Sequence, residues 1–225
     1  MTLPNSDAWT NASNTSDTSG NDHSALARYY HWHARIYDAT RWSFLFGRTA
    51  LIHALASTPH PPRNILEIGC GTGDNLLRLA RQFPEAAITG LDLSIDMLRR
   101  ARRKVETHRL PITLLQQHYD RPLYPKPIFD LIVFSYCLSM INPGWNLALE
   151  SAVQDLRPGG RLAVVDFHDT RFAGFRRWMG IHHVRMDGHL LSFLSTISQP
   201  MTTTLHKAYG GGWRYFHFIG QKLDG

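Results

Sequence analysis

The chain has 225 residues, 43% of them hydrophobic and 19% charged, which is the composition of a globular domain with short additions. No apolar run reaches the roughly 20 residues that a membrane-spanning helix needs, and the two cysteines, Cys70 and Cys137, have neither a zinc nor a disulfide spacing. The net charge of +6 favours an acidic partner, but nucleic acid, an anionic membrane surface and an acidic small molecule all satisfy it.

Residues 1–23 are rich in Ser, Thr, Asn and Asp and lack the basic start and apolar middle of a signal peptide. Such a segment buries too little apolar surface to order itself, so we expect a disordered tail. Residues 24–225 are predicted to form a single domain. Its expected parts are a helical cap (24–58), a ligand-binding core (63–168), a helical insertion (169–198) and two C-terminal strands (202–221).

In the cap, apolar residues recur at helical spacing and predict two helices that meet near Asp38–Arg41, before "TPHPPR" breaks the chain. From Arg63 onward, strands and helices alternate, which predicts a parallel sheet with helices on both faces. The expected strands are 64–69, 86–93, 111–117, 129–136 and 159–169, and the expected helices are 73–83, 94–108 and 144–156, the second of them capped by Ser94.

The C-terminal part follows another pattern. "TRFAGFRRWMGIHHVRMDGHLLSFLSTI" looks helical and irregular, and "TTTLHKAYGGGWRYFHFIGQ" looks like two strands joined through glycines. We therefore expect an open α/β fold whose mainly parallel, seven-stranded sheet ends in an antiparallel hairpin.

The segment "LEIGCGTGDN" places Glu67 at the end of a strand and Gly69, Gly71 and Gly73 before a helix. Glycines allow a tight turn and a close ligand, which the free N–H groups of the helix start would face. The spacing is G-x-G-x-G, whereas the dinucleotide fingerprint is G-x-G-x-x-G. Asp92 ends the next strand, where an acidic side chain would grip ribose hydroxyls. The alternative is that the glycines only permit tight packing.

This pattern resembles motif I of the class I S-adenosylmethionine-dependent methyltransferases, which implies a Rossmann-like fold and S-adenosyl-L-methionine as cofactor. "LDLSIDMLRRAR" resembles the second motif of that family, in which Leu93 and Met97 would flank the adenine. The family often has an acidic residue after the third strand; "LLQQHYD" leaves Gln117, His118 and Asp120 open for that place.

Ser135 and Tyr136 follow the fourth strand, and in the family this position is the rim between cofactor and substrate. The segments "HARIYDATRWSFLFGR", "FSYCLSMIN" and "GGWRYFHFIG" resemble the betaine-lipid synthases, over roughly residues 28–220. That resemblance implies an N-methyltransferase that converts diacylglyceryl homoserine to diacylglyceryl trimethylhomoserine, with a separate aminocarboxypropyl-transfer enzyme as partner. A phosphatidylethanolamine or other small-molecule methyltransferase remains open, and a nucleic-acid-binding protein is suggested only by the basic charge.

Candidate site residues also lie upstream of the glycine turn. Tyr37 and Arg41 would sit over the cofactor pocket with Arg48 a turn or two away, and an arginine suits a carboxylate bidentately. The alternative for both arginines is a solvated face or an ion pair with Asp38.

A methyltransferase acting on an amine needs a group that accepts the amine proton. Tyr37, Tyr136, Asp166 and His168 are candidates for this role. For each of them, capping or hydrogen bonding at a strand end is the alternative.

Finally, "RFAGFRRWMGIHHVR" puts Phe172, Phe175, Trp178 and Met179 near one helical face with Arg171, Arg176 and Arg177 beside them. Such a helix can lie in a membrane interface and meet anionic head groups, although it can also simply cover the sheet. We expect a cytoplasmic protein associated peripherally with the inner face of the membrane. No histidine pair has a metal-ligand pattern, so no metal is expected.

Overall fold

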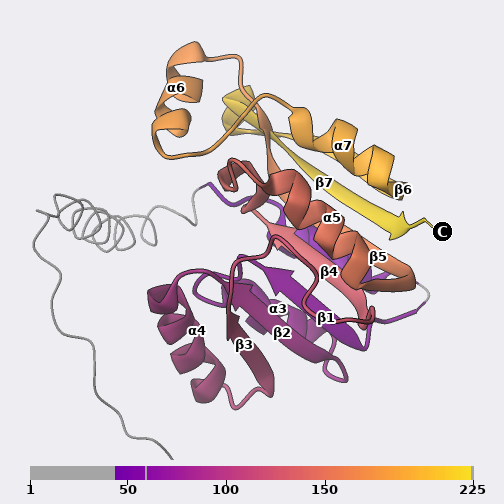
Figure 1. The fold of residues 1–225 in the computed structure, drawn as a ribbon. Coiled ribbons are helices and arrows are strands. Elements are labelled where there is room, and N and C mark those ends of the chain that lie inside the picture. Colours follow the sequence, from indigo (N-terminus) through magenta and orange to yellow (C-terminus); the bar gives the residue numbers. More distant parts are fainter. Residues whose placement is uncertain (1–43, 59, 224–225) are drawn as a thin grey trace, which may run out of the picture. The chain divides into compact units, whose positions relative to one another are not determined.

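A computed structural model of the chain describes residues 44–58 and 60–223, and the chain divides into two units, Met1–Phe44 and Leu45–Gly225. The second unit contains one seven-stranded sheet in the order β3-β2-β1-β4-β5-β7-β6 (Figure 1). The strands are β1 (Asn64–Ile68), β2 (Ala87–Asp92), β3 (Ile112–Gln116), β4 (Phe129–Ser135), β5 (Leu156–Asp169), β6 (Ser198–Ala208) and β7 (Trp213–Lys222).

Strands β1 to β5 pair in parallel, and β7 lies antiparallel between β5 and β6. Because β1 has β2 on one side and β4 on the other, the strand order reverses at β1. Ligands of open α/β sheets bind at the carboxyl ends of the strands beside such a reversal. The residues that follow β1, β2 and β4 are therefore at the expected place for a site.

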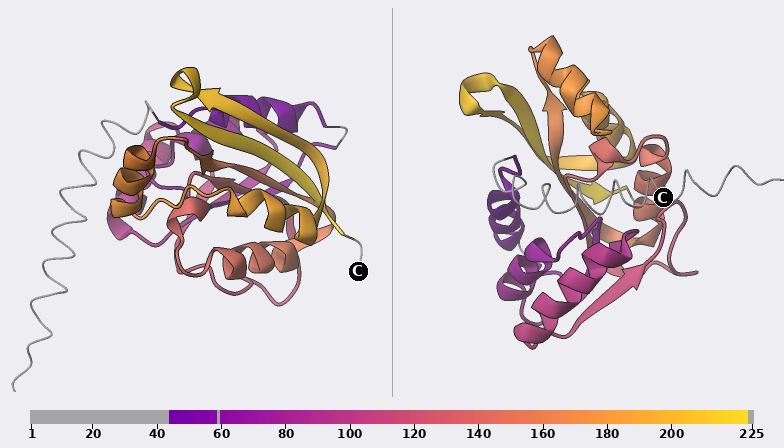
Figure 2. Two further views of the ribbon diagram at one scale, coloured as in Figure 1. Left: turned by 90° about the horizontal axis from the view of Figure 1, so that it is seen from above. Right: turned by 90° about the vertical axis from the view of Figure 1, so that its left-hand side faces the viewer.

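Helices cover both faces of this sheet. Figure 2 shows α2 (Arg48–Ala56) and α3 (Asp74–Gln82) on one face, and α5 (Trp145–Asp155) and α7 (His189–Ile197) on the other. The core under α5 and α7 includes Leu149 and Leu194 from the helices and Phe134, Phe216 and Phe218 from the strands. Alternate residues of β7 point to opposite faces, as strand geometry requires.

Two further helices complete the unit, α4 (Ile95–Thr107) and α6 (Ala173–Ile181), together with the short 3₁₀ turns η1 (Leu138–Met140) and η2 (Tyr209–Gly211). Ser94 caps α4 by accepting a hydrogen bond from the Met97 N–H at 3.4 Å, as the sequence predicts. In the described residues, no helix is long and apolar enough to cross a membrane.

The predicted fold class is confirmed, and so is every strand and helix predicted downstream of residue 63. Two strand starts differ from the prediction by more than one residue. β5 begins at Leu156 rather than 159 because Leu156 pairs with Phe129 before a register shift, and β6 begins at Ser198 rather than 202 because Ser198 pairs with Lys222. A second register shift lies between Pro200 and Thr202 on β6, which is an edge strand.

Candidate active site

The three glycines after β1 form a turn that only glycine adopts easily. Gly69, Gly71 and Gly73 have φ values of 66°, 55° and 81°, the left-handed region that disfavours residues with a Cβ. A Cβ added to Gly69 would lie 2.7 Å from the Cβ of Cys137, at the end of β4. The turn ends at the start of α3, where Gly73 provides no side-chain cap for the first N–H groups. The backbone can therefore approach a ligand closely.

Two carboxylates flank this turn and are held by it. Asp92 accepts hydrogen bonds from the N–H of Gly71 at 2.8 Å and of Ser94 at 2.9 Å, one on each oxygen. Glu67 is buried, and its Oε1 accepts a hydrogen bond from Asn75 Nδ2 at 2.8 Å. A carboxylate oxygen has two lone pairs, so partly exposed Asp92 keeps the capacity to accept hydroxyl groups of a ligand.

Beside Asp92, the chain offers an apolar surface and polar groups. Leu93 is 64% exposed, which is unusual for a large apolar side chain, and Met97 lies one helical turn further on. Gln117 donates its N–H to the Asp92 carbonyl at 3.3 Å, and Nδ1 of His118 lies 3.3 Å from a carboxylate oxygen of Asp120, with both side chains exposed. An exposed leucine and a half-buried methionine next to hydrogen-bonding groups suit the flat face and polar edge of a base.

The rim after β4 is formed by Ser135 and Tyr136. Tyr136 is buried with φ of 54°, and its hydroxyl donates a hydrogen bond to the carbonyl of Phe46 at 2.8 Å. Burial raises the pKa of this phenol well above its ordinary value, and the Arg48 guanidinium opposes the rise. Ser135 is also buried, and among the described residues its hydroxyl has no hydrogen-bond partner. The geometry favours Tyr136 as a support of the rim.

Asp166 on β5 is fully buried and ties the rim to the sheet. It accepts hydrogen bonds from the N–H of Ser139 at 3.2 Å and of Phe167 at 2.8 Å. Burial raises the pKa of this carboxyl to about 6, and these N–H donors limit the rise. A carboxyl with no exposed surface positions its neighbours and does not touch a ligand.

His168, two residues further along β5, is only half-buried. Its ring packs edge-on against Phe216 with 6.2 Å between the ring centroids, and its Nδ1 has no partner among the described residues. Burial lowers the pKa of His168, although the Asp169 charge opposes this. The imidazole is therefore neutral near pH 7, the form that can accept a proton.

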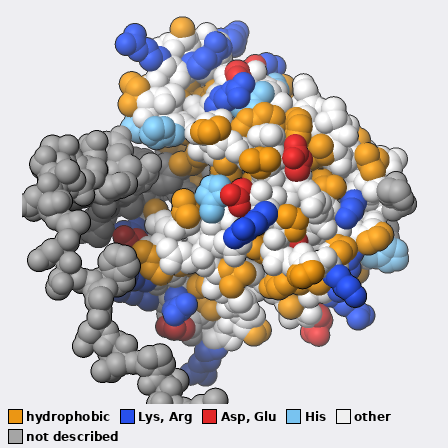
Figure 3. Space-filling view, in the orientation of Figure 1, with side chains coloured by type: hydrophobic (Ala, Val, Ile, Leu, Met, Phe, Trp, Pro, Cys, Tyr) orange, Lys and Arg blue, Asp and Glu red, His pale blue; other side chains and the backbone are white. Residues whose placement is uncertain are grey.

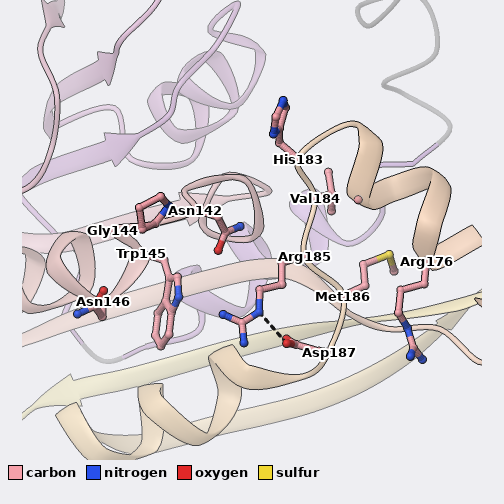
Figure 4. A pocket seen from close by; sticks show the side chains of 12 residues that line it. Asn142, Gly144, Trp145, Asn146, Arg176, His183, Val184, Arg185, Met186 and Asp187 are labelled. Atoms are coloured by element: carbon pink, nitrogen blue, oxygen red, sulfur yellow. Dashed lines mark hydrogen bonds and ion pairs between the residues drawn. The ribbon is translucent and has the colours of Figure 1, made fainter.

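A groove of about 680 Å³ opens next to this rim (Figure 4). Its lining residues are Asn142, Pro143, Gly144, Trp145, Asn146, Arg176, Gly180, His183, Val184, Arg185, Met186 and Asp187. The Arg185 N–H donates to the Ser139 carbonyl at 2.8 Å, which joins one wall of the groove to the rim. Arg185 Nε also donates to Asp187 at 2.6 Å. Arginine and amide side chains beside a tryptophan suit a polar, anionic ligand.

The structure brings most of the predicted site residues to one edge of the sheet. Asp92 accepts a hydrogen bond from Gly71 in the turn, Glu67 accepts one from Asn75 just after the turn, and the charge of Arg48 acts on Tyr136 at the rim. Tyr37 and Arg41 lie outside the described residues. The sequence analysis missed Asn75, Cys137 and Ser139. Asn75 follows the glycine turn directly, which is the signal that would have found it.

Comparison with known proteins agrees with this geometry. Residues 65–160 match the family described as "Methyltransferase domain". Over 103 residues, the chain is 36% identical to trans-aconitate 2-methyltransferase of Rhodopseudomonas palustris, which covers 46% of this chain and 38% of that protein. Over 106 residues, it is 33% identical to demethylmenaquinone methyltransferase of Thermus thermophilus, which covers 47% and 48%. The chain spans less than half the length of these curated relatives.

Two solved structures show the same fold. The N-methyltransferase NodS of Bradyrhizobium japonicum in complex with S-adenosyl-L-homocysteine superposes with a TM-score of 0.65 at 22% identity, over 79% of this chain and 86% of that one. The 1,6-didemethyltoxoflavin-N1-methyltransferase of Burkholderia thailandensis, with its substrate and S-adenosylhomocysteine, gives 0.68 at 15% identity, over 94% of both chains.

The fold and the glycine turn are those of the class I S-adenosylmethionine-dependent methyltransferases. The match to a methyltransferase domain covers residues 65–160, from β1 into β5. The described residues fit its cofactor, because the turn leaves no Cβ in the way and Asp92 is fixed beside it with spare acceptor capacity.

Proposed function

We propose that this protein is an S-adenosylmethionine-dependent N-methyltransferase that trimethylates the homoserine amine of diacylglyceryl homoserine to give diacylglyceryl trimethylhomoserine. The observation that carries the methyl-transfer part is the hydrogen bond between Asp92 and Gly71, which joins the ribose-binding carboxylate to the glycine turn. The identity of the substrate is supported by the resemblance of three segments outside the cofactor half to the betaine-lipid synthases, and by the cationic groove beside the rim.

The cofactor, when bound, supplies a methyl group on a sulfonium. The protein's own task is to align the amine, exclude water and remove the amine proton, because only a neutral amine can attack. Among the described candidates, His168 is best suited to accept that proton, since its imidazole is neutral and half-buried. Tyr136 is less suited because its hydroxyl is already engaged as a donor.

The groove offers a place for the homoserine carboxylate. Arg185 is oriented by Asp187 through Nε, and Arg176 donates from Nη2 to the Thr170 carbonyl at 2.6 Å. A guanidinium held in place in this way binds a carboxylate with less loss of side-chain freedom. The Trp145 ring forms one wall beside these cations.

Lipid analysis and an assay with purified protein test the proposal. Cells that express the chain together with an aminocarboxypropyl-transfer enzyme should contain diacylglyceryl trimethylhomoserine, and cells that express either protein alone should not. The purified protein should transfer labelled methyl groups to diacylglyceryl homoserine in preference to phosphatidylethanolamine, demethylmenaquinone and trans-aconitate. Methylation of one of these other acceptors while diacylglyceryl homoserine stays inert would overturn the substrate assignment.

Tyr37 and Arg41 provide a residue-level test upstream of the described part. We expect Tyr37→Phe to slow turnover with cofactor affinity retained, since only a hydroxyl is lost. Arg41→Ala should weaken binding of the carboxylate-bearing lipid by about 1.5–3 kcal/mol, the usual range for a hydrogen bond to a charged group. Parental rates and affinities in both variants, measured per folded molecule, would remove this segment from the site.

A further inference from the structure

Large apolar side chains are exposed together on α6 and at the tip of the β6–β7 hairpin. Phe172, Trp178 and Ile181 are 57%, 46% and 61% exposed, and Tyr209 in η2 is 62% exposed. We call these four residues the α6 platform. Burial of such side chains ordinarily contributes about 1.5–3 kcal/mol each, so four neighbouring side chains with this much exposed surface mark a surface of interaction.

The remaining apolar residues of α6 face inward. Met179 is buried, and the Phe175 ring stacks on Trp213 with 5.3 Å between centroids. Residues three or four positions apart share a helix face, so Arg177, Trp178 and Ile181 point outward together with Gly174. A Cβ added to Gly174 would meet no heavy atom within 4 Å, so this position of the outward face is open.

Arginines surround the platform. Residues 169–187 contain four arginines and two aspartates. Arg214 pairs with Asp169 and Arg185 with Asp187, so both aspartates already have a cationic partner. Arg171 and Arg177 form no ion pair with any acidic residue in the described ranges. Figure 3 shows blue and orange side chains mixed over α6, at the top of the view.

We infer that the α6 platform docks the protein on an anionic lipid surface, with Phe172, Trp178, Ile181 and Tyr209 entering the interface and Arg171 and Arg177 meeting the head groups. Exposed aromatic and aliphatic residues flanked by arginines are the composition of interfacial helices. Phosphate contacts of a nucleic acid would use the arginines and leave Ile181 in water, so the apolar exposure favours lipid.

The groove lies beside the α6 platform, so docking on a lipid surface would bring lipid head groups close to the groove. Arg176 and Gly180 belong to α6 and also line the groove, and Arg176 is adjacent in sequence to Arg177. A lipid head group at the docked face would therefore have the groove and the rim within reach. Docking of the α6 platform rests on the proposed function only for the nature of the lipid that enters the groove.

Sedimentation with vesicles tests the inference on the full chain. Vesicles of phosphatidylglycerol and phosphatidylcholine should retain the parent protein. Pure phosphatidylcholine vesicles should retain at least about tenfold less of it, because they have no net negative charge to attract the surface arginines. The variant Arg171→Glu/Arg177→Glu should lose at least about tenfold in partitioning to the anionic vesicles. The variant Phe172→Ser/Ile181→Ser should lose a similar factor.

The matched control carries the same charge change elsewhere. Arg102 and Arg103 are exposed on α4, and Arg102→Glu/Arg103→Glu should partition like the parent if the position of the charges matters. Gly174→Leu should increase partitioning several-fold, because it adds an apolar side chain on the open face. Brominated lipids should quench the parent's fluorescence more than that of Trp178→Phe.

Equal losses in the α4 and α6 charge variants would overturn the inference, since they would show a non-specific charge effect. Unchanged partitioning of both α6 variants would also overturn it, and so would parental quenching in Trp178→Phe. These two outcomes are expected if another part of the chain or a protein partner covers this face. Methyl transfer to a short-chain, water-soluble diacylglyceryl homoserine separates the two proposals. If the α6 variants keep that activity and lose vesicle binding, docking is supported; if the parent binds vesicles but methylates no homoserine lipid, only the proposed function fails.

Discussion

Two regions at the same edge of the sheet hold an aspartate in similar ways and give it different roles. Asp92 after β2 and Asp166 on β5 each accept two backbone N–H groups. Asp92 remains partly exposed beside the glycine turn, whereas Asp166 has no exposed surface. Hydrogen bonds from the backbone therefore do not distinguish the carboxylate proposed to bind a ligand from the structural one; their difference in exposure to solvent does.

The largest expected effect is on cofactor binding. Asp92→Ala removes the acceptor of the Gly71 and Ser94 N–H groups as well as the proposed contact with the ribose. We expect S-adenosylhomocysteine affinity to fall by a few kcal/mol, or on the order of 100-fold, as for other charged hydrogen bonds. Calorimetry measures this, with Glu106→Ala on the exposed side of α4 as the control. Parental affinity in Asp92→Ala would remove Asp92 from the cofactor site.

Asp166→Asn should change the pH dependence of stability. The folded-state pKa of about 6 lies above the usual 3.8, so the native state binds more protons between these values. The parent's free energy of unfolding should therefore fall, by on the order of 3 kcal/mol from this group, as pH rises from about 4 to about 6. The asparagine variant should lose that fall. Denaturant unfolding across this range measures it, and an unchanged profile would contradict the buried state of Asp166.

His217 changes the free energy of unfolding in the opposite direction between about pH 4 and 6, so it needs its own control. Burial lowers its pKa to about 4, with the nearby His206 adding to the effect, so this group makes stability rise with pH up to about its unfolded value. The two contributions are of similar size and largely cancel in the parent, so His217→Gln should show a steeper fall between pH 4 and 6 than the parent does. A shallower fall would show that His217 is charged in the folded state.

Two glycines distinguish the packed region from the open one. Gly47 has φ of 81°, and an added Cβ would lie 2.6 Å from Tyr215 Cε2 and also meet His217. Gly47→Ala should lower the free energy of unfolding by about 2 kcal/mol. Gly174 on α6 has open space, so Gly174→Ala should leave it unchanged or raise it by up to about 1 kcal/mol through helix propensity. Equal destabilisation by both would contradict the open face of α6.

The smallest effect is expected on the basic face of α4. Arg99 pairs with Asp96 at 3.1 Å, and both side chains are well exposed. Arg99→Ala should change the free energy of unfolding by less than about 0.5 kcal/mol, because exposed ion pairs contribute little. A large loss in thermal unfolding experiments would show that this face is packed rather than solvated.

The sequence predicts those features that depend on local patterns. The alternation of strands and helices predicts the parallel sheet. The spacing of Gly69, Gly71 and Gly73 predicts the turn, and Asp92 is predicted beside it because the ends of adjacent parallel strands meet at one edge of the sheet. Ser94 was found as a cap for the same local reason.

Contacts between distant segments could not be predicted in this way. The Tyr136 hydroxyl donates to a carbonyl 90 residues earlier, and Asp166 is buried by the turn after another strand. The four apolar residues predicted near one helical face differ in burial, because Met179 is buried and Phe175 packs on Trp213 while Phe172 and Trp178 are exposed. Helical spacing predicts which residues share a face of the helix, but it does not predict which face packs against the β6–β7 hairpin.

The register shift on β6 has a consequence for association between copies of the protein. β6 is an edge strand with exposed Met201 and Leu205, and a long flat edge of this kind can pair with the same strand of another copy. Pro200 has no N–H to offer a neighbour, the bulge between Pro200 and Thr202 twists the strand, and Lys207 places a charge near its end. These features disfavour strand-to-strand aggregation at the one place where the hairpin leaves backbone unpaired, and they protect the protein in crowded solution.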